Sequence, residues 1–304
     1  IYSGLNWNPD LRAPLTEPGV EVSEGDYILA VDGREVTGED NIFAFFENTS
    51  GRQTILTVGS EPGMAGSREI TVVPIGSESS LRNRDWVEGN RRKVEEMTDG
   101  RIGYVYLPNT GSGGYTYFNR YFFSQQDKEG FVIDERFNGG GQVANYIVEY
   151  LGKKLLNYWA PRTGPDYSSP FAANFGPKVM IINENAGSGG DWMPFYFREA
   201  GVGPLIGKRT WGGLVGIGGT PGLMDGGSVT APNFGIFSKD GEWIIENEGV
   251  APDYDVEMTP RDVIEGRDPQ LERAIEVVMA RLQAEGYTKT PRPQFPNRSR
   301  GGGR

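Results

Sequence analysis

The stretch GFVIDERFNGGGQVANYIVEYL, residues 130–151, decides the fold class. Residues 130–134 form a continuous apolar run that ends in an acidic residue, which is the pattern of a strand buried on both faces. A run of glycines follows at 139–141, and residues 143–151 then repeat apolar side chains at the spacing of an amphipathic helix. Strand, glycine turn and helix in this order predict one unit of a mainly parallel sheet.

The same order returns at residues 177–198, PKVMIINENAGSGGDWMPFYFR, where a buried strand meets a second glycine-rich turn and a second helix. Further strand and helix patterns lie at 102–107, 115–125 and 271–282. We therefore predict an α/β domain over residues 101–287, with helices on both faces of the sheet. Aromatic residues crowd the helix at 115–125, and we interpret them first as core and second as a subunit contact. They are Tyr115, Tyr117, Phe118, Tyr121, Phe122 and Phe123.

The N-terminal part of the chain, residues 1–76, has the short strands of a small β-rich domain. Strands are predicted at 27–31, 34–36, 54–58 and 69–73, and the dipeptide Asp32-Gly33 is a strong hairpin signal between the first two. Residues 77–100 are charged and helical, and we interpret them as a linker helix. Residues 288–304, rich in Pro, Arg and Gly, predict a flexible basic tail. Because neither an initiator Met nor a signal peptide opens the chain, we expect it to belong to a longer protein.

The composition excludes several classes of protein. With 41 acidic and 30 basic residues the net charge is −11, which argues against nucleic acid or an anionic membrane as a partner. No apolar run reaches the roughly 18 residues of a membrane-spanning helix. Cysteine and histidine are both absent, so thiolate nucleophiles, disulfides, zinc sites of the usual kind and an imidazole base within this chain are excluded. We expect no metal and no other cofactor.

The two glycine-rich turns are the candidate site, because ligands bind beyond the carboxyl ends of parallel strands. Ser188 stands at the start of a helix, where free N–H groups and the helix dipole stabilise negative charge. The glycine run at 139–141 offers further N–H groups, so the pair of turns suits a serine nucleophile with an oxyanion hole. The alternatives are a plain N-cap for Ser188 and an ordinary tight turn for the glycines. A dinucleotide site is disfavoured because the acidic residue expected about twenty positions after the glycines is missing.

Several motifs taken together resemble the carboxy-terminal processing protease superfamily, and within it the tricorn protease family. Residues 23–36 resemble a PDZ domain, although only about twenty residues precede them, so we expect the PDZ domain to be truncated at its N-terminus. The other motifs are 6–12, 14–20, 84–87, 134–141, 158–162, 183–191, 206–213 and 246–253. This resemblance implies a Clp protease/crotonase-like core, and a serine endopeptidase that cuts peptides and unfolded polypeptides.

The resemblance also implies roles for single residues. Ser188 looks like the nucleophile and Glu246 like the glutamate that supports a histidine base, while Gly189, Gly140 and Gly141 look like the oxyanion donors. In the family the histidine lies in a domain that precedes the PDZ domain, so the missing N-terminal domains of the same protein are an expected partner. Tricorn proteases are homohexamers of prokaryotic cytoplasm, and we expect a homo-oligomer there, with export to the periplasm left open because the lack of cysteine fits both compartments.

Alternatives to the tricorn scheme remain. A serine–lysine dyad is disfavoured, because Arg209 lines up with the family's lysine and stays protonated, and because Lys208 is expected to point away from Ser188. Asp166 is a candidate for the selection of a basic substrate residue, and Asp191 is interpreted as a helix-start acid. A rival from another class is a peptide-binding scaffold that has lost catalysis.

Overall fold

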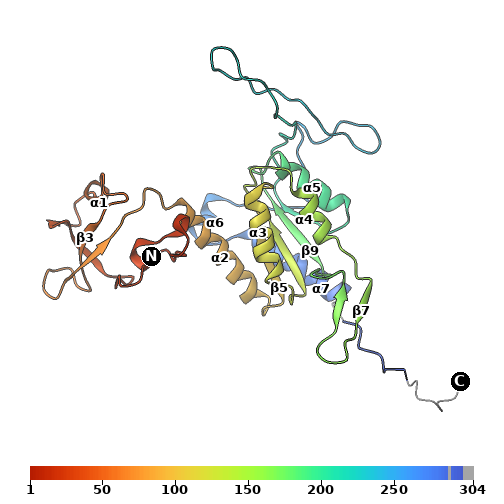
Figure 1. Cartoon of the computed structure of the whole chain (residues 1–304), viewed down its shortest axis with the longest axis horizontal. Helices are drawn as coiled ribbons and strands as arrows, with labels where there is room; N and C mark the ends of the chain where they lie inside the picture. Colours follow the sequence, from red (N-terminus) through yellow and green to blue (C-terminus); the bar gives the residue numbers. More distant parts are fainter. Residues whose placement is uncertain (287–288, 297–304) are drawn as a thin grey trace. The chain divides into compact units, whose positions relative to one another are not determined.

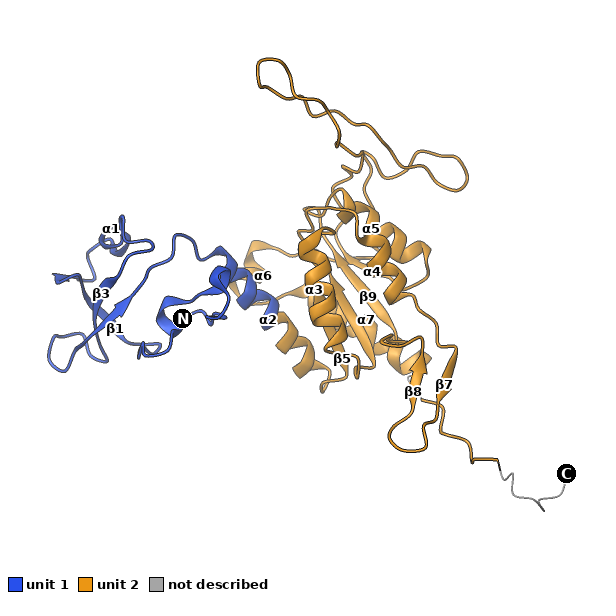
Figure 2. Cartoon of the chain, viewed as in Figure 1, with its two compact units in different colours: residues 1–89 blue, residues 90–304 orange. Residues whose placement is uncertain are grey.

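The computed structural model describes residues 1–286 and 289–296 of the chain. The chain divides into two compact units, residues 1–89 and residues 90–304 (Figure 2). The predicted tail at 288–304 lies outside the described residues except for 289–296. Among the residues described, no helix is both long enough and apolar enough to cross a membrane.

The first unit is built on a four-stranded antiparallel sheet with the strand order β2-β1-β3-β4. At the predicted hairpin, Asp32 and Gly33 have φ angles of 47° and 75°, as a two-residue hairpin turn requires. Apolar side chains of β1, β3 and β4 form the core of this unit. The bounds are η1 Pro9–Leu11, η2 Pro14–Thr16, β1 Tyr27–Val31, β2 Arg34–Glu35, α1 Ile42–Phe45, β3 Thr54–Gly59 and β4 Arg68–Val72.

The second unit contains a parallel five-stranded sheet with the order β11-β10-β9-β6-β5 (Figure 1). Every residue of β5, β6 and β9 is buried, which explains their mainly apolar sequences. The bounds of these strands are β5 Ile102–Tyr106, β6 Gly130–Asp134, β9 Lys178–Ile182, β10 Leu205–Gly207 and β11 Tyr254–Asp255. The mixed α/β class with a Clp protease/crotonase-like core, preceded by a small β-rich PDZ-like region, is thereby confirmed.

Helices cover both faces of the sheet. β5, β6 and β9 are parallel neighbours, and crossovers between such strands are right-handed as a rule, which puts the helices that follow them on one face; α7 packs on β6, β9 and β10 from the other. The bounds are α2 Ser79–Met97, α3 Ser112–Phe123, α4 Ala144–Leu151, α5 Gly189–Glu199, α6 Pro260–Ile264 and α7 Pro269–Glu285. The aromatic side chains of α3 belong largely to this packing, since Phe118 and Phe122 are fully buried and stack on each other.

Two segments extend from this core. A hairpin of β7 (Asn157–Trp159) and β8 (Tyr167–Ser169) follows α4, at the end of the sheet opposite to the glycine turns (Figure 1). Residues 214–244 form the long arm between β10 and β11; it has no helix or strand and is joined by bridges at Gly216–Phe234 and Phe237–Trp243. The arm and the two glycine turns meet at the carboxyl end of β9, where the candidate site lies.

Candidate active site

Ser188 sits on a strained turn between β9 and α5. Its φ and ψ are 57° and −117°, a conformation that costs a residue other than glycine on the order of 1–3 kcal/mol. Hydrogen bonds hold the turn from two sides, since the Ser188 N–H donates to the Gly213 carbonyl at 3.1 Å and the Gly187 N–H to the Asn138 carbonyl at 3.0 Å. A strained backbone fixed by neighbouring loops is characteristic of an exposed nucleophile.

The two glycine turns interlock at this point. Gly140 and Gly141 have φ angles of 87° and 135°, which L-residues rarely adopt. A Cβ atom on Gly140 would lie 3.0 Å from the Ser188 hydroxyl oxygen, and one on Gly189 would lie 2.7 Å from the Gly141 nitrogen. The structure therefore brings Ser188 together with all three glycines that the sequence predicted around it.

The three glycine N–H groups are not equivalent. The Gly140 N–H donates to the side-chain oxygen of Asn138 at 2.9 Å, so Gly140 presents no free donor, contrary to the prediction for it. Among the described residues, neither the Gly141 N–H nor the Gly189 N–H has an acceptor. Two free donors beside the Ser188 hydroxyl are the number that a minimal oxyanion hole requires.

Two buried, hydrogen-bonded side chains support the first glycine turn. Glu135 and Asn138 are fully buried, and the Asn138 amide donates to the Glu135 carboxyl at 3.0 Å while its oxygen holds Gly140. Burial raises the pKa of Glu135 well above its ordinary value, and the nearby Asp191 and Asp134 charges act in the same direction.

Two carboxylates hold the loop on the other side of Ser188. Asp191 accepts from the N–H groups of Gly212 and Gly213 at 2.7 and 3.1 Å, using a different oxygen for each. Glu246 accepts from the N–H groups of Leu214 and Val215 at 2.7 and 2.8 Å, using the same oxygen for both. We call this arrangement the carboxylate clamp: the carboxylates of Asp191 and Glu246, which accept hydrogen bonds from the N–H groups of residues 212–215.

The clamp fixes how far Glu246 lies from Ser188. The peptide group between Gly213 and Leu214 accepts from the Ser188 N–H at 3.1 Å and donates to the Glu246 carboxylate at 2.7 Å. With ordinary peptide dimensions, the Ser188 nitrogen and this carboxylate oxygen are separated by no more than about 8 Å. One imidazole and one hydroxyl group can span such a gap.

A cavity of about 940 Å³ lies in the first unit and one of about 620 Å³ lies at Ser188. The smaller cavity is lined by Ser188, Gly141 and Gly189, and the rest of its walls are mainly apolar and glycine residues of α5 and the arm. The remaining lining residues are Gln142, Asn145, Trp192, Leu214, Val215, Gly216, Ile217, Gly218, Phe234, Gly235 and Ile236. Its size and apolar walls suit a peptide side chain or a short extended segment.

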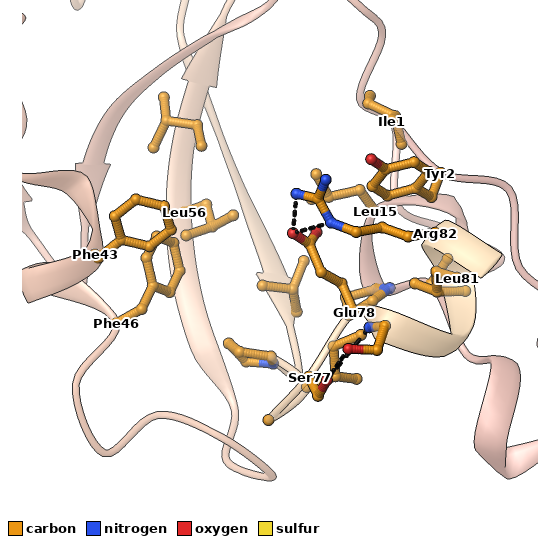
Figure 3. Close-up of a pocket in the computed structure, with 18 residues that line it drawn as sticks. Ile1, Tyr2, Leu15, Phe43, Phe46, Leu56, Ser77, Glu78, Leu81 and Arg82 are labelled. Carbon is orange, nitrogen blue, oxygen red and sulfur yellow. Dashed lines mark hydrogen bonds and ion pairs between the residues drawn. The ribbon is translucent and has the colours of Figure 1, made fainter. Parts of the chain in front are cut away.

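The larger cavity lies within residues 1–89 (Figure 3). In the figure Phe43, Phe46 and Leu56 face Tyr2, Leu15 and Leu81 across it. In this view a Glu78–Arg82 ion pair is drawn between these two groups of side chains. This cavity is lined mainly by apolar side chains, as a peptide-binding groove is.

The remaining predicted residues lie away from the Ser188 cavity. Lys208 binds Asp255 at 2.7 Å and Glu257 at 3.1 Å, and these partners raise its pKa, so it is not available as a base. Asp166 lies in the β7–β8 hairpin, where the Arg292 guanidinium donates to its carboxylate at 2.8 Å and lowers its pKa. The structure does not bring Asp166 of this chain together with Ser188.

Sequence reasoning missed the roles of Asn138 and Asp191. Asp191 was interpreted as an acid that complements the helix dipole, whereas it is fully buried and binds the loop that holds Ser188. The signal available in the sequence was a buried environment for an acid, since apolar and glycine residues flank it on both sides. In the part of the chain that the structure describes, no cluster of acidic side chains could hold a metal ion.

Comparisons with known proteins agree with this geometry. Residues 101–256 match peptidase family S41, and residues 1–77 match the tricorn protease PDZ domain. The crystal structure of the tricorn protease superposes with a TM-score of 0.85 at 36% identity, over 93% of this chain and 27% of that chain.

Curated relatives give the same result. The putative tricorn-like protease C-terminal subunit of Sulfurisphaera tokodaii is 39% identical over 93% of this chain and 32% of its own length. The tricorn protease of Thermoplasma acidophilum is 36% identical over 93% of this chain and 26% of its own length. The chain thus spans a third or less of these relatives. It belongs to the serine peptidase family S41 and corresponds to the C-terminal portion of the tricorn proteases, a tricorn-type PDZ domain followed by the peptidase domain.

Proposed function

We propose that this chain carries the nucleophile and the oxyanion hole of a tricorn-type serine endopeptidase that hydrolyses peptides and unfolded polypeptides. The observation that carries the proposal is the strained Ser188 turn with the free N–H groups of Gly141 and Gly189 beside it. S41 membership supports the same chemistry.

In the proposed reaction the Ser188 oxygen attacks the carbonyl carbon of the scissile peptide bond. Its proton passes to a histidine supplied by a region outside this sequence, and the carbonyl oxygen becomes an oxyanion bound by Gly141 and Gly189. The C–N bond then breaks as the leaving amine takes that proton, which leaves an acyl-enzyme on Ser188. Water, deprotonated by the same histidine, hydrolyses the ester and restores the serine.

Glu246 is proposed to orient that histidine through an intervening hydroxyl group. One of its carboxylate oxygens holds residues 214–215, and the other has no partner among the described residues. A carboxylate whose position is already fixed by two N–H groups orients a base at little further cost in conformational entropy. Its distance from Ser188 is compatible with this arrangement.

The test uses the full-length natural protein with a fluorogenic unstructured peptide and a fluorophosphonate probe. Ser188→Ala is expected to lower kcat/KM by on the order of a thousandfold or more and to abolish labelling. Ser112→Ala, another serine at a helix start, is the matched control and should retain both. Labelling of a different serine, or unchanged hydrolysis in Ser188→Ala, would reject the proposal.

A second candidate function is peptide binding without hydrolysis, and the apolar cavity of residues 1–89 favours it. Phe43→Glu would then abolish the binding of unstructured peptides, while Ser188→Ala would leave it unchanged. Peptide binding that depends on Phe43, in a protein that no fluorophosphonate labels, would support the scaffold over the enzyme.

We further propose that the protein works as a homo-oligomer, six copies by its similarity to the tricorn proteases. An acidic body with a basic terminal segment and exposed apolar side chains on the arm, such as Ile217, Met224 and Phe237, is consistent with contacts between copies. Light scattering of the full-length protein tests this, and a monomer mass at micromolar concentration would overturn it.

A further inference from the structure

The neighbourhood of the oxyanion donors contains one more polar group. Among the described residues, the buried side-chain atoms without a hydrogen-bond partner are Thr110 Oγ1 and Glu135 Oε1. Thr110 is fully buried, and a Cβ atom on Gly189 would lie 2.0 Å from its hydroxyl oxygen. The hydroxyl group therefore contacts the Cα atom of Gly189, the residue that follows the nucleophile.

The main chain of Thr110 holds the other donor. Its N–H donates to the Gly140 carbonyl at 2.9 Å, its carbonyl accepts from the Val143 N–H at 2.7 Å, and Thr110 and Gly141 form a parallel bridge. In a parallel bridge of this kind the N–H of the second residue, here Gly141, points away from its partner. The bridge thus leaves the Gly141 N–H free for the cavity at Ser188.

We propose that Thr110 is a positioning residue that sets the separation of the Gly141 and Gly189 donors. This inference rests on the proposed function of Ser188. The Thr110 main chain fixes the first donor, and its hydroxyl oxygen limits how closely the second approaches. Oxygen accepts a Cα–H at about 3.3–3.6 Å, whereas a methyl carbon requires about 3.5–4.0 Å. Oxyanion donors act only within about 2.7–3.1 Å of the oxyanion, so a shift of a few tenths of an ångström changes the rate.

The buried hydroxyl without a partner is itself informative. Such a group lowers stability, because burial removes its hydrogen bonds to water and nothing replaces them. A valine at this position has nearly the same shape and would remove that cost. The proposal therefore predicts opposite effects on stability and on catalysis, which a packing role would not produce.

The experiment compares Thr110→Val and Thr110→Ser with wild type in the full-length natural protein, with the fluorogenic peptide as substrate and a peptide aldehyde as inhibitor. Thr110→Val should lower kcat on the order of tenfold, with KM within about twofold of wild type, and should weaken inhibition by the peptide aldehyde by a similar factor. The unfolding midpoint of Thr110→Val should equal or exceed that of wild type. Thr110→Ser, which keeps the hydroxyl, should restore kcat to within about threefold of wild type.

Each other outcome overturns the proposal. If kcat of Thr110→Val is close to that of wild type, Thr110 has no positioning role. If both variants lose activity and stability in parallel, Thr110 acts only through packing. A wild-type protein whose hydrolysis does not depend on Ser188 would reject the proposed function itself, and the inference with it.

Discussion

The carboxylate clamp makes a sharp prediction about two acids that bind neighbouring N–H groups in different ways. Asp191 uses one oxygen for Gly212 and the other for Gly213, whereas Glu246 uses a single oxygen for both of its partners. An amide side chain has only one acceptor oxygen. Asp191→Asn must therefore turn its NH₂ group toward one of these two N–H groups, while Glu246→Gln can keep both hydrogen bonds.

The expected magnitudes follow from this difference. Asp191→Asn loses a hydrogen bond to a charged group and leaves one of the two N–H donors without an acceptor, so the unfolding free energy should fall by about 3 kcal/mol. Glu246→Gln loses only the charge, at a half-buried site, and should cost about 1 kcal/mol. Because the Gly213 carbonyl accepts from the Ser188 N–H, Asp191→Asn should also displace Ser188 and, under the proposed function, lower kcat.

Urea unfolding followed by tryptophan fluorescence measures the free energies, and hydrogen exchange of residues 210–216 gives a local readout. The N–H groups of Gly212 and Gly213 should exchange faster in Asp191→Asn but not in Glu246→Gln. Equal losses of stability in the two variants, or a loss below about 1 kcal/mol in Asp191→Asn, would refute the assignment of separate oxygens to separate donors.

Three further predictions concern buried groups of the second unit. Burial lowers the pKa of Lys178 to about 7, so the unfolded chain binds the lysine proton more tightly than the folded one. The unfolding free energy of wild type should therefore rise by about 2 kcal/mol between pH 7 and 9, and that of Lys178→Met should not. The raised pKa of Glu135 acts in the opposite sense. Its contribution to the unfolding free energy is complete below the pKa of the unfolded chain and is lost as the pH rises through the pKa of the folded protein. In thermal unfolding, the stability of Glu135→Gln relative to wild type should therefore be higher at pH 8 than at pH 5. Gly189→Ala places a Cβ atom 2.0 Å from Thr110 Oγ1 and should cost about 2 kcal/mol in urea unfolding. Gly139→Ala, whose Cβ atom would meet nothing within 4 Å, should change stability by less than about 0.5 kcal/mol, and a similar cost for both variants would contradict the close contact.

The sequence by itself determined the fold class and the glycine-flanked turn at Ser188. The mainly apolar runs at 130–134 and 177–182 indicate strands covered on both faces, and the glycines that follow them predict turns at the same edge of a parallel sheet. The dipeptide Asp32-Gly33 determined its hairpin for a similarly local reason, because few residues tolerate two positive φ angles in succession. These are effects of chain periodicity and backbone sterics, which act within a few residues.

Only the tertiary structure decided which groups are free to act. Gly140 and Gly141 are alike in sequence, but the Asn138 side chain occupies the N–H of one and a bridge to Thr110 turns the other outward. Asp191, an ordinary helix-start acid by its position, became part of the clamp because the loop at 212–213 folds over it. Asp166 is engaged by Arg292, more than a hundred residues later in the chain. Hydrogen bonds between distant segments depend on how the elements pack, and no local pattern of residues carries that information.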